Sequence, residues 1–278
     1  MVSAMRLADG RQLSYAEWGD PDGFPVVHFH GTPGSRVQRY PNDSVTRENG
    51  VRFIVPDRPG YGGSDPVERS TLLGHAEDVD ELLTELGIDT FAAHGISGGG
   101  PFALAAAWRF GPRVTSTALL ACVGPMDRPD ALEGMHEGNA QVYRVAIHHP
   151  EQLADALANF EEPTMPKVER AALARVPGLL RMALHGAEIT FQQGDAGVLG
   201  DYYALAVPWT FPVGEITTPV RMWHGVLDEL VPVSHSAHLA EALPDATFLP
   251  CEGEAHFSMF AHQREVLSYL TGTAHQPA

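Results

Sequence analysis

The chain contains little cysteine, and this absence limits its chemistry. Its 278 residues include only two cysteines, Cys122 and Cys251, so a framework of disulfide bonds is excluded. Both cysteines lie in apolar, strand-like contexts and neither shows the spacing of metal ligands. We therefore expect two buried free thiols, and no metal or other cofactor.

Basic residues and long apolar runs are also scarce. The 18 lysines and arginines are outnumbered by 35 acidic residues, which gives a formal net charge of −17. A charge of this sign disfavours nucleic acid and anionic membranes as partners. No apolar stretch is long enough to cross a bilayer, and the N-terminus lacks the pattern of a secretory signal. We expect a cytoplasmic protein that acts on a small-molecule substrate.

What the sequence does have is an alternation of strand-like and helix-like segments. The length suits one sizeable domain with an insertion, or two small domains. The expected strands are 12–18 (in an exposed position), 24–30, 51–56, a strand that leads from residue 91 into a glycine-rich turn with one serine, 114–123, 219–224 and 247–250. The expected helices are 36–49, 71–86, an alanine-rich helix that follows the serine turn and ends at residue 110, 234–243 and a segment after His256. This alternation predicts an α/β fold with a mostly parallel sheet that helices cover on both faces.

The alternation is interrupted after residue 125. From 126 to 212 the patterns are helical, for example over 135–148, 151–160 and 168–185, and no strand is convincing. We therefore predict a helical cap, 126–212, inserted into a core domain made of 1–125 and 213–278. Most apolar residues of the cap are expected to seal it onto the core, and a minority to line a pocket. The tail, 273–278, is expected to be disordered.

One short segment carries most of the chemical information. Gly95-Ile96-Ser97-Gly98-Gly99 fits the G-x-S-x-G pattern of a nucleophile elbow, with a predicted strand before it and an alanine-rich helix after it. Glycines on both sides of the serine let the backbone turn sharply. The turn is expected to raise the Ser97 hydroxyl above the sheet as a nucleophile.

A serine nucleophile needs a base and a group that orients the base. Among the 14 histidines, His256 alone follows the last predicted strand and precedes the last helix, so we predict that it is the base. Asp228, on a strand-to-helix turn, is the predicted acid. Asp127, just after another strand, remains the alternative acid, and Glu229 is adjacent to Asp228.

Donors for the developing oxyanion are also predicted. The glycine-rich loop that contains Thr32 follows an early strand, and its amide would join that of Gly98 at the start of the elbow helix. A second loop, 57–65, lacks the lysine and the spacing of a phosphate-binding loop. We interpret it as a structural turn near the pocket in which Asp57 and Arg58 brace loops.

Together these motifs resemble the α/β-hydrolase superfamily over nearly the whole chain. The matching segments are His30-Gly31-Thr32-Pro33-Gly34, Asp57-Arg58-Pro59-Gly60-Tyr61-Gly62-Gly63-Ser64, Gly95-Ile96-Ser97-Gly98-Gly99, Gly225-Val226-Leu227-Asp228 and Gly253-Glu254-Ala255-His256. The resemblance implies a Ser97–Asp228–His256 triad, an oxyanion hole formed by Thr32 and Gly98, and no cofactor. A serine nucleophile argues against haloalkane dehalogenases and epoxide hydrolases, which use aspartate. The loop at residues 30–34 departs from the HGGPG pattern of proline iminopeptidases.

The expected function is hydrolysis of a carboxylic ester through an acyl-enzyme on Ser97, with a small, partly hydrophobic substrate. The same groups would serve a thioesterase, an amidase or peptidase, or a carbon–carbon bond hydrolase. A non-catalytic receptor for small molecules built on the same fold is the alternative from a different class. The oligomeric state is not predicted.

Overall fold

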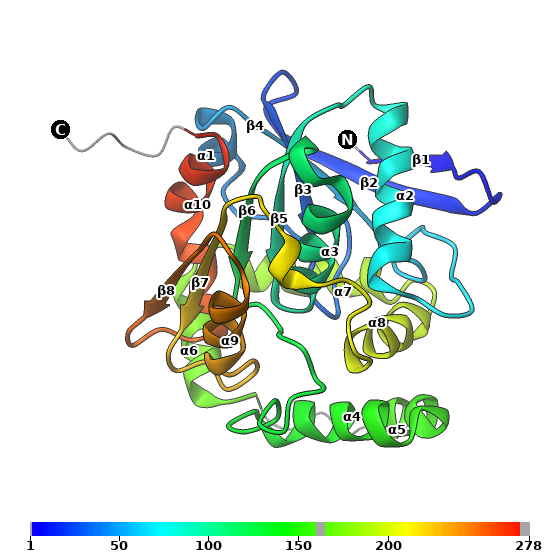
Figure 1. Cartoon of the computed structure of the whole chain (residues 1–278), viewed down its shortest axis with the longest axis vertical. Coiled ribbons are helices and arrows are strands. Elements are labelled where there is room, and N and C mark those ends of the chain that lie inside the picture. Colours follow the sequence, from blue (N-terminus) through cyan, green and yellow to red (C-terminus); the bar gives the residue numbers. More distant parts are fainter. Residues whose placement is uncertain (1, 160–164, 273–278) are drawn as a thin grey trace.

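The computed structural model describes residues 2–159 and 165–272, which form an eight-stranded sheet with flanking helices (Figure 1). The strand order is β1-β2-β4-β3-β5-β6-β7-β8. The strands are β1 (Val2–Arg6), β2 (Gln12–Gly19), β3 (Phe24–Phe29), β4 (Val51–Pro56), β5 (Phe91–Ile96), β6 (Val114–Leu120), β7 (Val220–Gly225) and β8 (Ala246–Cys251). Strand β2 pairs antiparallel with β1 and β4, and the pairs from β4 to β8 are parallel.

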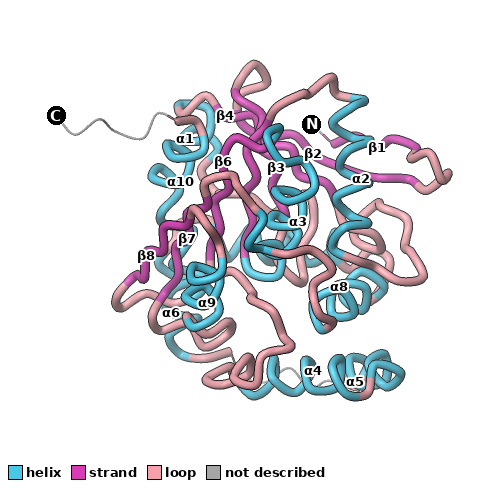
Figure 2. The backbone as a smooth tube through the Cα atoms, in the orientation of Figure 1, coloured by secondary structure: helices cyan, strands magenta, loops and turns pink. Residues whose placement is uncertain are grey.

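Helices cover both faces of the sheet, as predicted (Figures 1 and 2). One face carries α2 (Leu72–Glu85), α3 (Gly100–Phe110) and α9 (Ser234–Ala242), whose apolar side chains join the larger core cluster. The other face carries α1 (Asp43–Glu48) and α10 (Gln263–Leu270). Because helices cover both faces of the central strands, β5 is buried at all six positions, whereas the edge strand β8 has no buried position.

Local sequence explains where α2 begins and which side it buries. The Thr71 hydroxyl caps its N-terminus by accepting a hydrogen bond from the Gly74 amide at 2.9 Å. Its buried side chains include Ala76, Val79 and Leu83, at the helical spacing of three and four.

The described part of segment 126–212 is helical and adds no strand to the sheet. Its helices are α4 (Glu137–His148), α5 (Leu153–Ala158), α6 (Lys167–Arg175), α7 (Leu179–Thr190) and α8 (Ala196–Ala206). In Figure 1, α4 and α5 lie at the lower end of the molecule. The role of this segment as a cap stays a prediction.

Several expected helices differ from the observed ones. The expected helix 36–49 is reduced to α1, because the Arg36 backbone donates to Asp57 and Pro41 interrupts the segment. The expected helix 168–185 is two helices, α6 and α7, which are separated at Pro177 and Gly178. Gly178 has a φ of +84° and precedes α7, a conformation that glycine adopts without strain. Part of the expected helix 151–160 and the tail 273–278 lie outside the described residues.

Expected strands also needed correction. Strand β1 was not expected, and its pairing makes β2 an internal strand with buried positions rather than an exposed one. Strand β6 ends at Leu120 because Ala121 takes a φ of +46°, which cannot continue a strand. Cys122 is buried as expected, whereas Cys251 is half-buried. Among the described residues, no helix combines the length and apolar character needed to cross a membrane.

Candidate active site

The candidate nucleophile occupies a strained turn between β5 and α3. Ser97 has a φ of +55°, one of two non-glycine residues in the described chain with a positive φ. This conformation costs an L-residue about 1–2 kcal/mol. A Cβ at Gly99 would lie 2.1 Å from the Phe29 carbonyl oxygen, so the turn packs against β3 too closely for a side chain. Ser97 itself remains partly exposed between buried neighbours.

An aspartate and a histidine meet beyond the carboxyl ends of β7 and β8. His256 Nδ1 lies 2.7 Å from Asp228 Oδ2, and both side chains are buried. The other carboxylate oxygen, Oδ1, accepts hydrogen bonds from the amides of Leu230 at 2.9 Å and Val231 at 2.8 Å. These two amides fix the carboxylate, and the carboxylate in turn fixes the imidazole ring.

The surroundings of this pair set its charge. Burial tends to raise the pKa of Asp228, but the charge of His256 and hydrogen bonds from His224 and His256 hold that pKa below its usual range. Burial tends to lower the pKa of His256, but the charge and hydrogen bond of Asp228 outweigh it, so that pKa is raised. Asp228 is therefore ionised at neutral pH and accepts the Nδ1 proton of His256. This tautomer, assigned from the hydrogen bond, leaves Nε2 free to accept a proton.

The structure chooses between the candidate acids. Asp228 contacts His256. Asp127 and Glu229 both have exposed side chains, and within the described chain neither bonds to His256. Asp228 is thus the partner of the imidazole, and its role as the catalytic acid stays a prediction.

His224 supports Asp228 from the end of β7, a contact that the sequence analysis missed. Its Nε2 lies 2.8 Å from the Val231 carbonyl oxygen and 3.3 Å from Asp228 Oδ2, and its Nδ1 lies 2.7 Å from the Ser236 hydroxyl. A histidine four residues before the candidate acid was the available signal, but in a buried strand it resembles an ordinary core residue.

The loop after β3 lies against the elbow. A Cβ at Gly98 would be 2.4 Å from Thr32 Oγ1 and 3.4 Å from Leu205 of α8. In residues 2–159 and 165–272, neither the Thr32 amide nor the Gly98 amide donates a hydrogen bond within the protein. Two neighbouring amides without partners are what an oxyanion hole requires.

A buried ion pair connects this loop to α8. Asp201 accepts hydrogen bonds from Arg58 at 2.6 and 2.8 Å, from the Thr32 hydroxyl at 2.6 Å and from the Tyr61 hydroxyl at 2.8 Å. Arg58 also donates to the Gly31 carbonyl oxygen at 2.9 Å. The interpretation of Arg58 as a residue that braces loops agrees with these contacts. Asp201 was not identified from the sequence because nothing there places α8 beside the Thr32 loop.

A second carboxylate from segment 126–212 reaches the histidine loop. Glu169 of α6 is 0% exposed, and its two oxygens accept hydrogen bonds from the amides of His256 at 3.1 Å and Phe257 at 3.3 Å. Burial raises the pKa of Glu169, while the charge of His256 and the two amides act in the opposite direction. No motif in the sequence indicates this contact, since a glutamate in a charged helix usually faces solvent.

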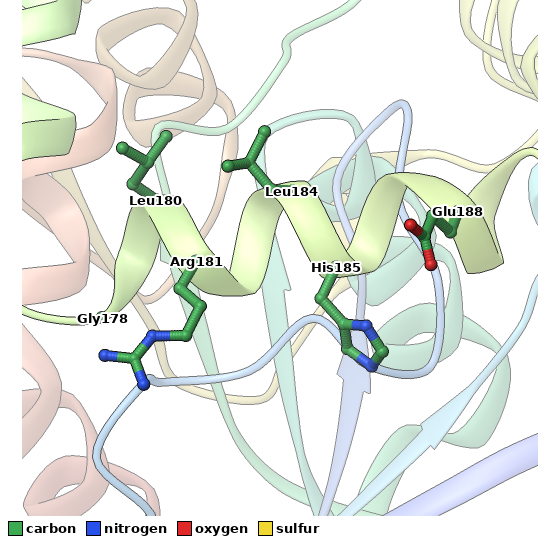
Figure 3. A pocket seen from close by; sticks show the side chains of 6 residues that line it. All are labelled: Gly178, Leu180, Arg181, Leu184, His185 and Glu188. Atoms are coloured by element: carbon green, nitrogen blue, oxygen red, sulfur yellow. The ribbon is translucent and has the colours of Figure 1, made fainter.

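Two hollows differ in their relation to these groups. The larger, about 560 Å³, follows the outer side of α7 and is lined by Gly178, Leu180, Arg181, Leu184, His185 and Glu188 (Figure 3). The smaller, about 380 Å³, is lined by Asp228 together with residues such as Leu227, Val168 and Pro232. The smaller hollow is therefore the one that adjoins the candidate site.

The chain shares its sequence pattern and fold with known proteins. Residues 25–263 match a family model described as the alpha/beta hydrolase fold. A non-heme chloroperoxidase from Streptomyces lividans is 30% identical over 96% of this chain and 97% of its own. A proline iminopeptidase from Xylella fastidiosa is 28% identical over 60% of this chain and 55% of its own. The crystal structure of a bromoperoxidase from Bacillus anthracis superposes with a TM-score of 0.74 at 21% identity, over 97% of this chain and 99% of that one.

Proposed function

Because this chain belongs to the alpha/beta-hydrolase family, we propose that it is a serine hydrolase whose nucleophile, acid and base are Ser97, Asp228 and His256. The proposed substrate is a small, partly hydrophobic carboxylic ester. The observation that carries the proposal is the 2.7 Å contact between the buried Asp228 carboxylate and His256. This contact leaves Nε2 as a base at the edge of the sheet where the Ser97 turn also lies.

The proposed reaction has two halves. In the first, Ser97 Oγ attacks the ester carbonyl carbon while His256 Nε2 takes the hydroxyl proton, and as the ester C–O bond breaks His256 gives that proton to the departing alcohol. In the second, His256 removes a proton from water, which attacks the acyl-enzyme; the bond to Ser97 Oγ then breaks, His256 returns the proton to Oγ, and the carboxylic acid is released. The amides of Thr32 and Gly98 would stabilise both oxyanions, and each donor contributes about 10²–10³ in rate.

Two features support an ester with an apolar portion. Leu205 of α8 lies beside Gly98, so one wall of the proposed oxyanion site is apolar. The loop at residues 30–34 departs from the proline iminopeptidase pattern, which favours an ester over a peptide. Hydrolysis of an amide bond remains the second candidate, because the Xylella relative named as a proline iminopeptidase aligns over 60% of the chain.

Replacement of the nucleophile tests this function. Wild type should hydrolyse short-chain p-nitrophenyl esters and react with a fluorophosphonate at Ser97. The S97A variant should lose turnover by about 10⁶-fold in kcat, the loss seen when a serine hydrolase loses its nucleophile. The matched control is S44A, at an exposed serine of α1, and it should retain full turnover.

The possible outcomes separate the candidate functions. Turnover that persists in S97A, or a probe attached to a different residue, would contradict the assignment of the nucleophile. Faster cleavage of proline amides than of esters would favour the peptidase. Stoichiometric binding of a small molecule with no turnover in wild type would favour a receptor.

A further inference from the structure

Three potential metal ligands gather beyond the end of β8. Cys251 is the last residue of the strand, Glu254 lies in the following turn, and His262 ends the 3-10 helix His256–His262. One ligand atom from each, the sulfur, a carboxylate oxygen and an imidazole nitrogen, all lie within 4.8 Å of one another. The shortest separation, between His262 Nε2 and Glu254 Oε2, is 2.8 Å.

We propose that Cys251, Glu254 and His262 form a binding site for a divalent cation of the zinc type. Zinc is bound by thiolate, imidazole and carboxylate at about 2.0–2.3 Å, so its tetrahedral ligands lie roughly 3.5 Å apart. Small side-chain rotations would bring the three atoms to this spacing. The mixture of sulfur, nitrogen and oxygen favours zinc or cobalt over magnesium and calcium, which prefer oxygen alone.

A fourth residue supports the site from outside. Glu265 Oε2 lies 3.4 Å from His262 Nδ1, the ring nitrogen that faces away from Glu254. A carboxylate on the distal nitrogen is a common arrangement for a metal-binding histidine, because it orients the ring and increases its basicity.

The site is open to solvent, so a cation could enter without unfolding. Cys251 is half-buried, and the side chains of His262 and Glu254 are 21% and 34% exposed. With three protein ligands, the fourth position would be left for water. The sequence analysis found no metal-ligand spacing because the ligands come from a strand, a turn and a helix end.

The position of the site connects cation binding to the segment that carries the proposed base, His256. Its ligands lie on both sides of His256 in the chain, and the Glu254 carbonyl oxygen accepts a hydrogen bond from the Leu227 amide at 2.8 Å, next to Asp228. A bound cation would therefore cross-link the segment that carries the proposed base. Because it binds the folded state only, it should raise the temperature of unfolding.

Cobalt titration tests the site independently of hydrolysis. The full-length protein, stripped with a chelator and kept reduced, is titrated with Co²⁺ and then with Zn²⁺. Wild type should bind one equivalent of Co²⁺ with a thiolate-to-cobalt charge-transfer band, which Zn²⁺ should abolish. Zn²⁺ should also raise its thermal midpoint.

Three variants each remove one proposed ligand, and a fourth serves as the control. C251S should lose the band, although it retains Cys122, and should lose the Zn²⁺ effect on the thermal midpoint. E254Q and H262A should each weaken Co²⁺ binding at least about tenfold, since each removes one of three ligands. The matched control is H149A, because His149 is an exposed histidine 3.8 Å from Glu151 with no cysteine nearby, and it should bind as wild type does.

Three results would overturn the proposal. The first is the absence of a thiolate band in wild type. The second is a band that persists in C251S, which would place the cation at Cys122. The third is an equal loss of affinity in H149A and H262A, which would indicate nonspecific binding to surface histidines.

Discussion

At the scale of single residues, the candidate site consists of three residues that sequence motifs identify and of further residues that contact them from distant parts of the chain. Ser97, Asp228 and His256 were all identified from local pattern and order. Their supports were not, because Glu169 and His224 act through contacts rather than through a recognisable motif. Asp228 and Glu169 are the two charged groups that raise the pKa of His256, against the effect of its burial.

The charge of Glu169 should be visible in the pH dependence of hydrolysis. The free base form of His256 is required, so kcat/KM should fall as the pH falls through a pKa above the ordinary 6.5. In E169Q one negative charge near the imidazolium is lost, so this acid limb should move to lower pH, by roughly half a unit. The measurement is a pH profile of kcat/KM in buffer that contains a chelator.

A carboxylate on the surface provides the control for this experiment. Glu188 is exposed on α7, so E188Q should leave the profile unchanged. If E169Q moved the acid limb upward, or if both variants shifted it equally, Glu169 would not act on His256 through its charge.

At the scale of elements, helix α8 is held to the core by a buried ion pair. Arg58 and Asp201 side chains are each 1% exposed. Such a pair is costly to break, because the remaining partner keeps an unpaired charge in a buried site. Asp201 also accepts the hydrogen bond of the Thr32 hydroxyl, so the position of α8 and the geometry of the proposed oxyanion loop are connected.

Loss of Asp201 should therefore destabilise the whole protein. We expect D201A to reduce the free energy of unfolding by about 3–5 kcal/mol, measured by urea denaturation. The milder D201N variant, which keeps the shape of the side chain, serves if D201A does not fold. A loss below about 1 kcal/mol in both would mean that the ion pair does not hold α8.

An exposed ion pair gives the comparison. Glu137 and Arg144 lie in α4, and their contact is 2.7 Å, but their side chains are 73% and 47% exposed. Water screens such a pair, so E137A should lower the free energy of unfolding far less than D201A does.

At the scale of the whole molecule, the formal charge of −17 creates a negative field that acts on substrates before they bind. Salt screens this field over about 10 Å at 0.1 M ionic strength. A substrate that carries a negative charge should therefore be disfavoured at low salt.

This negative field should make kcat/KM for a charged substrate depend on the salt concentration. Between about 10 and 300 mM NaCl, kcat/KM for an anionic p-nitrophenyl ester should rise roughly two- to fivefold, because screening weakens the repulsion. A neutral ester of the same chain length is the control and should change little. A similar response of both esters would show that salt acts on the protein rather than on the encounter.

The sequence by itself determined the alternation of strands and helices, the family, and the three residues proposed for catalysis. Part of the elbow is local, because a Cβ at Gly95 would lie 2.8–2.9 Å from atoms of Gly99, Gly100 and Ala103. The contacts that exclude a side chain at Gly98 and Gly99 come instead from the region of Phe29 and Thr32. The break in the expected helix 168–185 also has a local cause, because Pro177 and Gly178 interrupt the helix. The helical periodicity on both sides of these residues made the break hard to predict.

Only the tertiary structure decided which distant groups complete the site. It placed Asp228 rather than Asp127 against His256, brought Glu169 and Asp201 from two helices of segment 126–212, and gathered Cys251, Glu254 and His262. The physical reason is that a carboxylate has the same local preferences whether it faces water or a buried partner. Its environment depends on how the helices pack on the sheet, and the packing is a property of the whole chain.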